Sequence, residues 1–503
     1  MNAPQRIIIN TIAQYTKAII SILLSLFATR LVIDALNVRD YGIYVLVGGV
    51  VGILGYFTNA MVVTTQRYLS HCYGKNDYEE AKRVFTNSAF IHLLVCLLFL
   101  IVLLTFKDMI LFSCLKIDNT RVWAAQNVYV CAGMMMIFSV LTTPFKAVLI
   151  AHENIVFTSL VDIFDAVLKL VLAISLFYVS YDKLVYYAFF LSLIFFVNLL
   201  IYGILATSRF KECRSCFYFS YVDKSYLVKL VGFAGWTSFS LFSGMCQIQG
   251  IAVIINHFMG TLVNASFGLA MQVNGAVRFV SVSILNAMNP QIMKAEGEGN
   301  RQQMVELASK ESRFSSAMMM IVAIPMIVEM DSILSSWLKN VPDYTALFCR
   351  SMMIAFIVDQ ITMGLHVANQ AIGNLKAFTL LTTVPKILML PILWLILDQR
   401  NEVIWMMTVY VGIELLVAIV RIPFMHFSAH IDGIEYAKNT IIPLCPLLLV
   451  IGIISIALHY INLFPYDFVV KLFIAAAVGV LTLWFFTMTA GERELAKKVL
   501  KKG

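Results

Sequence analysis

An arginine lies near the middle of an apolar stretch that is long enough to cross a membrane. The stretch is QVNGAVRFVSVSILNAMNPQI, residues 272–292, and the arginine is Arg278. Asn274 precedes it by one turn, and no carboxylate lies three or four residues away on the same helix. A charge at the bilayer centre costs about 2.5–3.5 kcal/mol, so it needs a partner or a wet cavity. Because a guanidinium group binds phosphate through two parallel hydrogen bonds, we predict an anionic ligand for Arg278.

A second arginine and several amides lie within other expected membrane helices. Arg30 is on the first helix, and Asp34 follows four residues later on the same face, so these two charges could pair. The amide candidates are Asn59, Gln249, Asn256 and Gln272. Side-chain amides suit the hydroxyl groups of sugars. The alternative is that each amide makes interhelical hydrogen bonds and nothing more.

Acidic residues inside the expected helices are weaker candidates for ion coupling. Asp165 and Lys169 are four residues apart on the fifth helix, which fits either a structural ion pair or a cation or proton site. Asp359, Lys386 and Glu414 on later helices present the same choice between an ion pathway and pairing across helices. Sequence alone leaves both alternatives open.

The elements that position these residues are the helices of an all-α, polytopic membrane protein. The chain has 503 residues, of which 60% are hydrophobic and only 13% charged, and its mean hydropathy is +0.84. Apolar stretches of membrane-spanning length recur throughout. We predict about fourteen transmembrane helices, with twelve as the alternative, at roughly 7–36, 41–71, 82–106, 121–150, 154–179, 183–207, 225–258, 262–294, 303–333, 343–373, 375–398, 401–425, 437–460 and 466–488. Most Lys and Arg residues then fall on the side of the termini, which predicts that both termini are cytoplasmic.

The order of the helices indicates an internal duplication. Aligning Gly52 with Gly275 lays the second helix over the eighth without a gap, and Gln66 then meets Asn289. We predict two pseudo-symmetric six-helix bundles whose polar first, second, seventh and eighth helices line a central cavity, with two further C-terminal helices. The predicted domains are an N-terminal bundle (1–207), a cytoplasmic linker (208–224), a C-terminal bundle (225–430), and two extra helices with a basic tail (431–503).

Several classes of function do not fit the sequence. No predicted loop is longer than about 20 residues, so there is no room for a soluble catalytic domain. The histidines are dispersed without metal-like spacing, and the nine cysteines suggest no disulfide framework. The net charge of +8 is a topology signal rather than a sign of nucleic-acid binding. We therefore expect no enzyme activity, no metal and no nucleic-acid partner.

Several motifs resemble those of a known transporter family. Residues 29–70, TRLVIDALNVRDYGIYVLVGGVVGILGYFTNAMVVTTQRYLS, resemble the opening of polysaccharide and O-antigen exporters, which are lipid-linked oligosaccharide flippases. FAGW at 233–236, QVNGAV at 272–277, NPQI at 289–292 and WLKNVPDYT at 337–345 resemble later motifs of that family. The likeness covers most of the chain and weakens after about residue 430. This family shares a superfamily with multidrug and toxic-compound extrusion antiporters and with the lipid II flippase.

The resemblance implies alternating access and movement of an undecaprenyl-pyrophosphate-linked glycan across the bacterial inner membrane. Arg30 and Arg278 occupy places comparable to cavity arginines of the lipid II flippase. The implied partners are the lipid-linked glycan, membrane lipids and the polysaccharide polymerase machinery. No cofactor is expected, and the driving force would be H⁺, Na⁺ or the membrane potential. The alternative is a cation-coupled multidrug antiporter of the same superfamily, for which Asp34 or Asp165 would be the embedded acid.

Overall fold

The computed structural model describes residues 3–52, 56–109, 119–215, 221–338, 341–400, 402–461 and 467–500. Residues 53–55 and 339–340 of the motifs quoted above lie outside these ranges. Every regular element in the described residues is helical, as predicted. Eleven of these helices are long and apolar enough to cross a membrane, or up to twelve if one bent pair counts as a single span. The predicted spans 41–71 and 154–179 also contain helices, but the second carries three charges at Asp162, Asp165 and Lys169.

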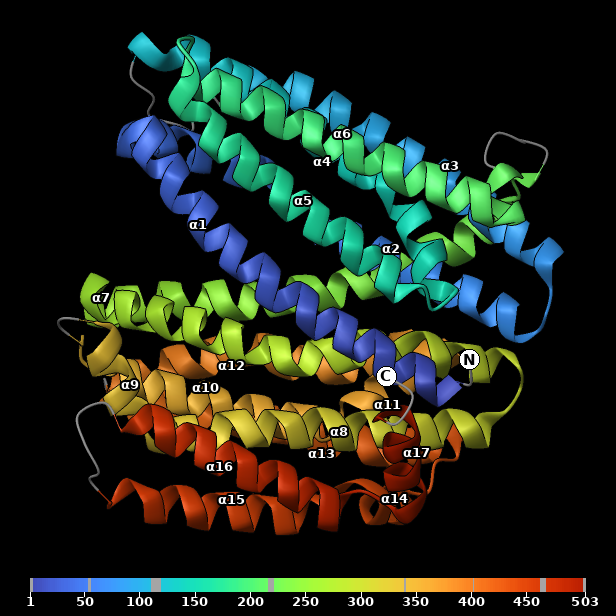
Figure 1. The fold of residues 1–503 in the computed structure, drawn as a ribbon, viewed down its shortest axis with the longest axis vertical. Coiled ribbons are helices and arrows are strands. Elements are labelled where there is room, and N and C mark those ends of the chain that lie inside the picture. Colours follow the sequence, from blue (N-terminus) through green and yellow to red (C-terminus); the bar gives the residue numbers. More distant parts are fainter. Residues whose placement is uncertain are drawn as a thin grey trace. The chain divides into compact units, whose positions relative to one another are not determined.

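The chain divides into two compact units. One unit is Ile9–Ser238, and its central helix α4 packs against α2, α3 and α6. Its apolar core includes Val32, Phe99 and Val128. The elements of this part of the chain are α1 (Ala3–Gly52), α2 (Tyr56–Gly74), α3 (Tyr78–Thr105), η3 (Asn119–Arg121), α4 (Val122–Ala151), α5 (Ile155–Ser175), η4 (Leu176–Tyr178), α6 (Lys183–Arg209), η5 (Lys211–Ser215) and the start of α7 (Lys224–Gly297) (Figure 1).

Local signals explain where several of these helices begin. Asp77 precedes α3, and its carboxylate accepts a hydrogen bond from the Glu80 backbone N–H at 2.8 Å. Asp182 precedes α6, and its carboxylate accepts hydrogen bonds from the backbone N–H groups of Leu184 and Val185. These side chains satisfy backbone donors that have no partner inside the helix. The membrane span in α1 is Ile9–Leu36, close to the predicted 7–36, although the helix itself continues to Gly52.

Helix α7 consists of two spans joined at Gly260. The spans are Lys224–Gly260 and Ser266–Gly297, close to the predicted 225–258 and 262–294. Gly260 has φ +82° and ψ −179°, a conformation that is essentially restricted to glycine. The kink between the two spans of α7 therefore depends on a residue without a Cβ atom.

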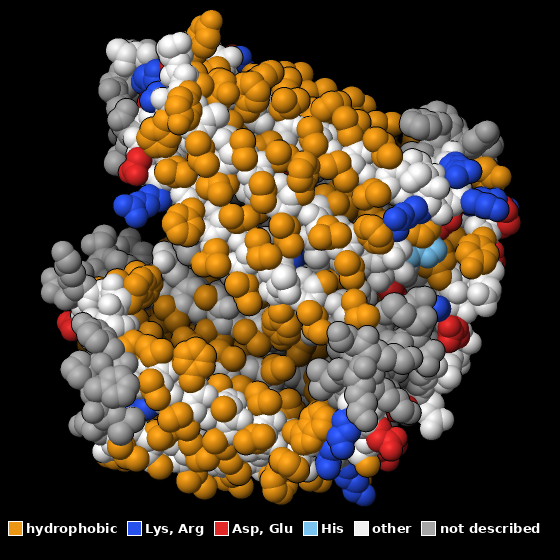
Figure 2. Space-filling model, viewed as in Figure 1, with side chains coloured by type: hydrophobic (Ala, Val, Ile, Leu, Met, Phe, Trp, Pro, Cys, Tyr) orange, Lys and Arg blue, Asp and Glu red, His pale blue; other side chains and the backbone are white. Residues whose placement is uncertain are grey.

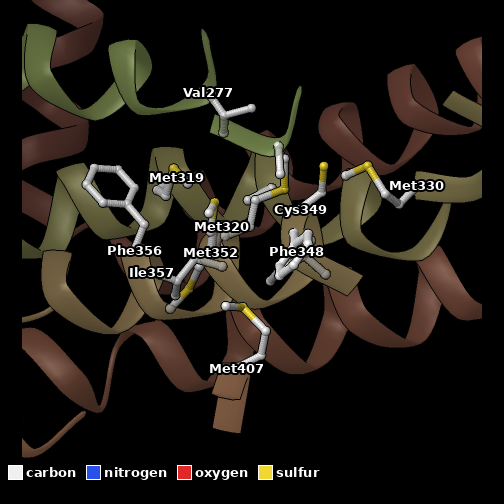
Figure 3. Packing of buried hydrophobic residues seen from close by; sticks show 14 of the residues in the cluster. Val277, Met319, Met320, Met330, Phe348, Cys349, Met352, Phe356, Ile357 and Met407 are labelled. Carbon is white, nitrogen blue, oxygen red and sulfur yellow. The ribbon is translucent and has the colours of Figure 1, made fainter. Parts of the chain in front are cut away.

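The other unit comprises Met1–Ile8 and Phe239–Gly503. Its core contains many methionines, and Figure 3 shows part of it, with Val277 of α7, Met320, Phe348, Met352 and Met407 in one cluster. The elements that follow α7 are α8 (Arg301–Val328), α9 (Met330–Trp337), α10 (Thr345–Gln360), α11 (Met363–Ile372), α12 (Leu375–Arg400), α13 (Val403–Ala429), α14 (Gly433–Tyr436), η7 (Ala437–Ile441), α15 (Leu444–His459), α16 (Phe468–Thr482), η8 (Leu483–Thr487) and α17 (Ala490–Leu500). The predicted span 343–373 is a broken one, since α10 and α11 meet at a bend of 46°.

The last helices of the chain attach to α8. Helices α15 and α16 pack against each other and against α8. Near the C-terminal end of α8, buried Glu329 accepts from His459 Nδ1 at 3.0 Å. Further back on α8, the buried Arg313 forms an ion pair with Glu492 of α17 and donates to the Asn439 carbonyl at 3.1 Å. Charged contacts therefore connect the C-terminal segment to both halves of one membrane helix.

The surface of each unit has the distribution expected in a membrane. Large hydrophobic side chains are exposed along the helices, for example Leu104, Ile204 and Phe473, at 68%, 65% and 73%. Figure 2 shows hydrophobic side chains over most of the visible helical surface, while Lys, Arg, Asp and Glu gather at the ends of the helices. Lipid would cover the apolar bands without cost.

Candidate functional site

The predicted site residues of the unit Ile9–Ser238 lie at its surface. Arg30 and Asp34 of α1 and Asn59 of α2 are all exposed. The pairing considered for Arg30 and Asp34 does not form, because no ion pair joins them in the described part of the chain. Exposed charges gain little from pairing when water or headgroups can solvate them separately.

The acids of α5 are neutralised within the same unit. Lys169 Nζ lies 2.6 Å from Asp165 Oδ2, and Asn198 Nδ2 donates to Asp165 Oδ1 at 2.7 Å. Asp162 forms an ion pair with Lys17 and lies 3.6 Å from Lys146 Nζ. The structural pairing of Asp165 with Lys169 is therefore present, which is one of the two alternatives that the sequence allowed.

The remaining predicted residues lie on the two spans of α7. Gln249 and Asn256 are exposed on the first span, and Gln272 and Arg278 are exposed on the second. Asn274 is only 5% exposed, and its Oδ1 atom has no hydrogen-bond partner within the described residues. The amides and Arg278 thus lie on the same element, and four of these five side chains reach its accessible surface.

Arg278 lies at the border between this surface and the core. Its guanidinium carbon is 4.5 Å from the ring centroid of Phe356 on α10, a cation–π contact. One turn later Ser281 is fully buried and donates to Gln360, also on α10. No carboxylate lies within ion-pair distance of Arg278 in the part of the chain that the structure describes.

Two ion pairs, each with one buried and one partly buried member, lie near Arg278. Lys386 Nζ of α12 is 2.8 Å from Glu414 Oε2 of α13, and Gln247 Nε2 donates to the other carboxylate oxygen at 3.0 Å. Arg421 Nη2 of α13 is 2.8 Å from Asp359 Oδ1 of α10. Pairing across helices, one of the two alternatives that the sequence allowed, is therefore present for Asp359, Lys386 and Glu414.

Arg421 also donates to the Thr362 hydroxyl at 3.2 Å, and it was not among the residues singled out from sequence. An arginine inside the predicted span 401–425 is the signal that could have found it. Its partner could not be read from the sequence, because Asp359 precedes it by 62 residues on another helix.

Charge balance distinguishes Arg278 from its neighbours. Arg278, Lys386 and Arg421 all act electrostatically on Asp359, so these groups form one cluster. The cluster contains three cations but only two carboxylates, Asp359 and Glu414, and each carboxylate is paired with a cation other than Arg278. Arg278 therefore carries the uncompensated positive charge. The arrangement can bind an anion through an exposed guanidinium whose position is fixed by an aromatic ring.

The structure offers no comparable arrangement for a metal. Across the described ranges, no group of three or more His, Cys, Asp and Glu side chains is placed to hold an ion.

Comparison with known proteins identifies the fold. No model of a known protein family and no curated protein sequence matches the chain. Solved structures do match. A MATE transporter in the bent conformation has a TM-score of 0.73 at 15% identity, with 87% of this chain and 97% of that chain covered. A MATE transporter in complex with MaD3S has a TM-score of 0.71 at 15% identity, covering 87% and 98%.

A third similar structure is a transporter of the MOP superfamily from Pyrococcus furiosus. Its TM-score is 0.69 at 14% identity, with 85% of this chain and 96% of that chain covered. Similarity at this level of identity concerns the backbone rather than the binding residues. The chain therefore has the fold of the MATE transporters of the MOP superfamily.

Proposed function

We propose that this protein is a membrane transporter for an anionic substrate, specifically an undecaprenyl-pyrophosphate-linked oligosaccharide. The observation that carries the proposal is the exposed guanidinium group of Arg278, which has no carboxylate partner among the described residues and lies next to a cluster in which the other cations do have one. Keeping such a charge inside a membrane helix is costly unless a ligand uses it. Pyrophosphate matches the paired N–H groups of arginine.

The amides support a glycan as the other part of the substrate. Gln249, Asn256 and Gln272 are exposed on α7, the helix that also carries Arg278. Amide groups both donate and accept hydrogen bonds, as sugar hydroxyls do. Arg30 and Asn59, exposed on α1 and α2, are the corresponding candidates of the other unit. The prenyl chain would remain in lipid, in contact with the apolar helix surfaces.

The same proposal includes the cellular setting. The excess of Lys and Arg on the side of the termini supports cytoplasmic termini in a bacterial inner membrane. The substrate would be presented on the cytoplasmic side and released outside for assembly of O-antigen or capsule by the polysaccharide polymerase machinery. Coupling to H⁺, Na⁺ or the membrane potential would drive the cycle.

A second candidate is a cation-coupled multidrug antiporter, and the fold supports it directly. One similar structure is described as an outward-facing multidrug resistance MATE family transporter. The Pyrococcus furiosus protein, by contrast, is described as having a binding pocket of reversed polarity that suggests a different function. Members of this fold therefore differ in pocket polarity, and the charge of the site has to be argued for each chain. In this chain the unpaired Arg278 favours an anion over a cationic drug.

The test compares Arg278→Ala with Arg278→Lys and with Arg400→Ala in a strain whose own copy is deleted. Arg400 is a matched control, since it is an exposed arginine over an aromatic ring, Trp405, at 4.7 Å. We expect Arg278→Ala to abolish surface polysaccharide and to cause lipid-linked repeat units to accumulate. Arg278→Lys should restore part of the export, because it keeps the charge but loses the planar fork. Arg400→Ala should behave as wild type.

Protein levels in the membrane are measured in parallel, so that a folding defect is recognised. Normal surface polysaccharide in an Arg278→Ala strain with normal protein level would contradict the proposal. Increased drug sensitivity on deletion, with no change in polysaccharide, would support the antiporter instead.

A further inference from the structure

Glu311, in the first half of α8, is fully buried and has no cationic partner among the described residues. Glu311 is 0% exposed, and α8 is one of the membrane-spanning helices. Other buried carboxylates of the same unit do have cations: Asp359 has Arg421, and Glu414 has Lys386. Within the described residues, no Lys, Arg or His lies within ion-pair distance of Glu311.

One amide holds one of the two carboxyl oxygens. Asn289 lies on the second span of α7. When its amide is oriented with Nδ2 toward the acceptors, it donates to Glu311 Oε1 at 2.9 Å and to the Leu285 carbonyl at 3.0 Å. The second oxygen, Glu311 Oε2, has no hydrogen-bond partner in the part of the chain that the structure describes. The carboxyl group therefore has one neutral donor and no counter-ion.

The charged and titratable groups around Glu311 are engaged elsewhere. On α8 itself, Lys310 pairs with Glu306 and Arg313 pairs with Glu492. On α14, Tyr436 is close enough to sense the charge of Glu311, but its hydroxyl bonds Ser312 Oγ at 2.9 Å and the Ile361 carbonyl at 2.8 Å.

The remaining neighbouring helices add no counter-ion either. On α11, His366 Nε2 is 3.0 Å from Gln370 Nε2. Helices α9, α10, α15 and α16 and the segment η7 also pack against α8, and in the described ranges none of them places a cation within ion-pair distance of Glu311. The cations of the second span of α7, Arg278 and Lys294, form no ion pair with Glu311 in these ranges either. No neighbouring element thus neutralises a carboxylate at this position.

An unpaired carboxylate sealed in such a site is strongly disfavoured, whereas the neutral acid is tolerated. A bound metal ion is a poor alternative, because hard cations need several oxygen ligands and this site offers one carboxyl group and one amide. The environment therefore favours a carboxylic acid in this conformation.

A cavity lies close to this site on another face of α8. Its volume is about 680 Å³, and it is lined by Ser309, Lys310, Arg313 and Tyr436, among others. Tyr436 lines the cavity while its hydroxyl contacts Ser312, the residue next to Glu311. Separation of α8 from α7 would uncover the carboxyl group on the face where Asn289 now covers it.

We propose that Glu311 is a proton-binding site of the transport cycle, neutral while α7 and α8 are packed together and ionised when they separate. The step is a simple dissociation: the carboxylic acid releases H⁺ to water and leaves a carboxylate, which Asn289 continues to hydrogen-bond. This inference rests on the proposed transporter function, but it does not depend on which substrate is carried.

The first test needs no substrate. Infrared spectra of the purified protein are compared for wild type, Glu311→Gln and Glu306→Gln, where Glu306 is an exposed acid on the same helix, paired with Lys310. We expect a protonated-carboxyl C=O band at neutral pH in wild type and in Glu306→Gln, and its loss in Glu311→Gln. Asn289→Ala should shift this band, since the carboxyl group loses its donor. A band that is absent from wild type, or unchanged in Glu311→Gln, would overturn the proposal.

The second test measures transport in reconstituted vesicles, with lipid-linked oligosaccharide as the probe. Glu311→Gln, an uncharged mimic of the acid, should still exchange substrate down its gradient but should no longer respond to an imposed pH gradient. Glu306→Gln should respond as wild type does. An unaltered pH response in Glu311→Gln, or a response to a Na⁺ gradient at constant pH that Glu311→Gln removes, would overturn proton binding. If no variant moves the probe while the infrared result holds, the substrate assignment fails and the proton site stands.

Discussion

Two arginines of the same unit show how surroundings decide the role of a residue. Arg421 is 4% exposed and is paired with Asp359, so its charge is used inside the protein. Arg278 is exposed, rests on Phe356 and has no carboxylate partner in the described residues. The same side chain is therefore structural in one place and available to a ligand in the other.

The buried pair of Lys386 and Glu414 gives a prediction at this scale. Glu414→Leu should lower the free energy of unfolding by about 3–5 kcal/mol, because it leaves the largely buried ammonium group of Lys386 without its counter-ion. Thermal unfolding in detergent measures the effect. The double variant Lys386→Met/Glu414→Leu should recover most of the loss, since no charge remains unpaired. Glu402→Gln, at the exposed start of α13, serves as the control. A cost below about 1 kcal/mol for Glu414→Leu would contradict the argument.

At the scale of elements, α7 and α8 carry most of the proposed chemistry. The second span of α7 presents Arg278 on its accessible surface and Asn289 to α8. Helix α8 carries Glu311, which contacts Asn289, and it also contacts α15, α16 and α17. Movement of α8 relative to α7 would therefore change the proton site and the support of the C-terminal helices together.

The break in α7 gives the prediction for this scale. Gly260→Ala should destabilise the protein by about 1–3 kcal/mol, because its backbone conformation is strained for any residue with a Cβ atom. Gly268→Ala in the same helix is the matched control, since it has an ordinary φ and no atom near the added methyl group. It should be neutral or stabilising, as expected for glycine replaced inside a helix. Chemical or thermal unfolding of the two variants should therefore move in opposite directions, and equal shifts would refute the role assigned to Gly260.

At the scale of the whole molecule, the sequence predicted the class of protein and most helices. The length of an apolar stretch and the break at Gly260 both depend on residues that are neighbours in the sequence. The ends of both spans of α7 were therefore predicted within a few residues. The bend between α10 and α11 was missed, because the hydropathy of 343–373 is continuous across it. Glu311 was missed for a different reason. It lies in the polar stretch SKESRFSS, which looks like a solvated helix start, and only packing against α7 shows that it is buried.

The topology remains a prediction at this scale, and accessible cysteines can test it. Lys75→Cys in the turn between α2 and α3 should be labelled by an impermeant thiol reagent only after permeabilisation. Ser180→Cys in the loop between α5 and α6 should be labelled in intact cells. Both are made with Cys445→Ser, because Cys445 is an exposed free thiol, and the parent chain reports the background. The reverse labelling pattern would place the termini outside the cell and would contradict entry of the substrate from the cytoplasm.

The ion pair between Arg313 and Glu492 has a consequence for how the protein is made. The two residues are 179 positions apart, so at 5–20 residues per second roughly 10–35 s of synthesis separate them. During that interval the insertion machinery must hold a nascent α8 whose arginine has not yet met its partner. A chain that stops before α17 would lack the carboxylate that neutralises Arg313 and would keep only the Asn439 carbonyl as its partner. Synthesis of the last helix therefore supplies the counter-ion of a helix that was made much earlier.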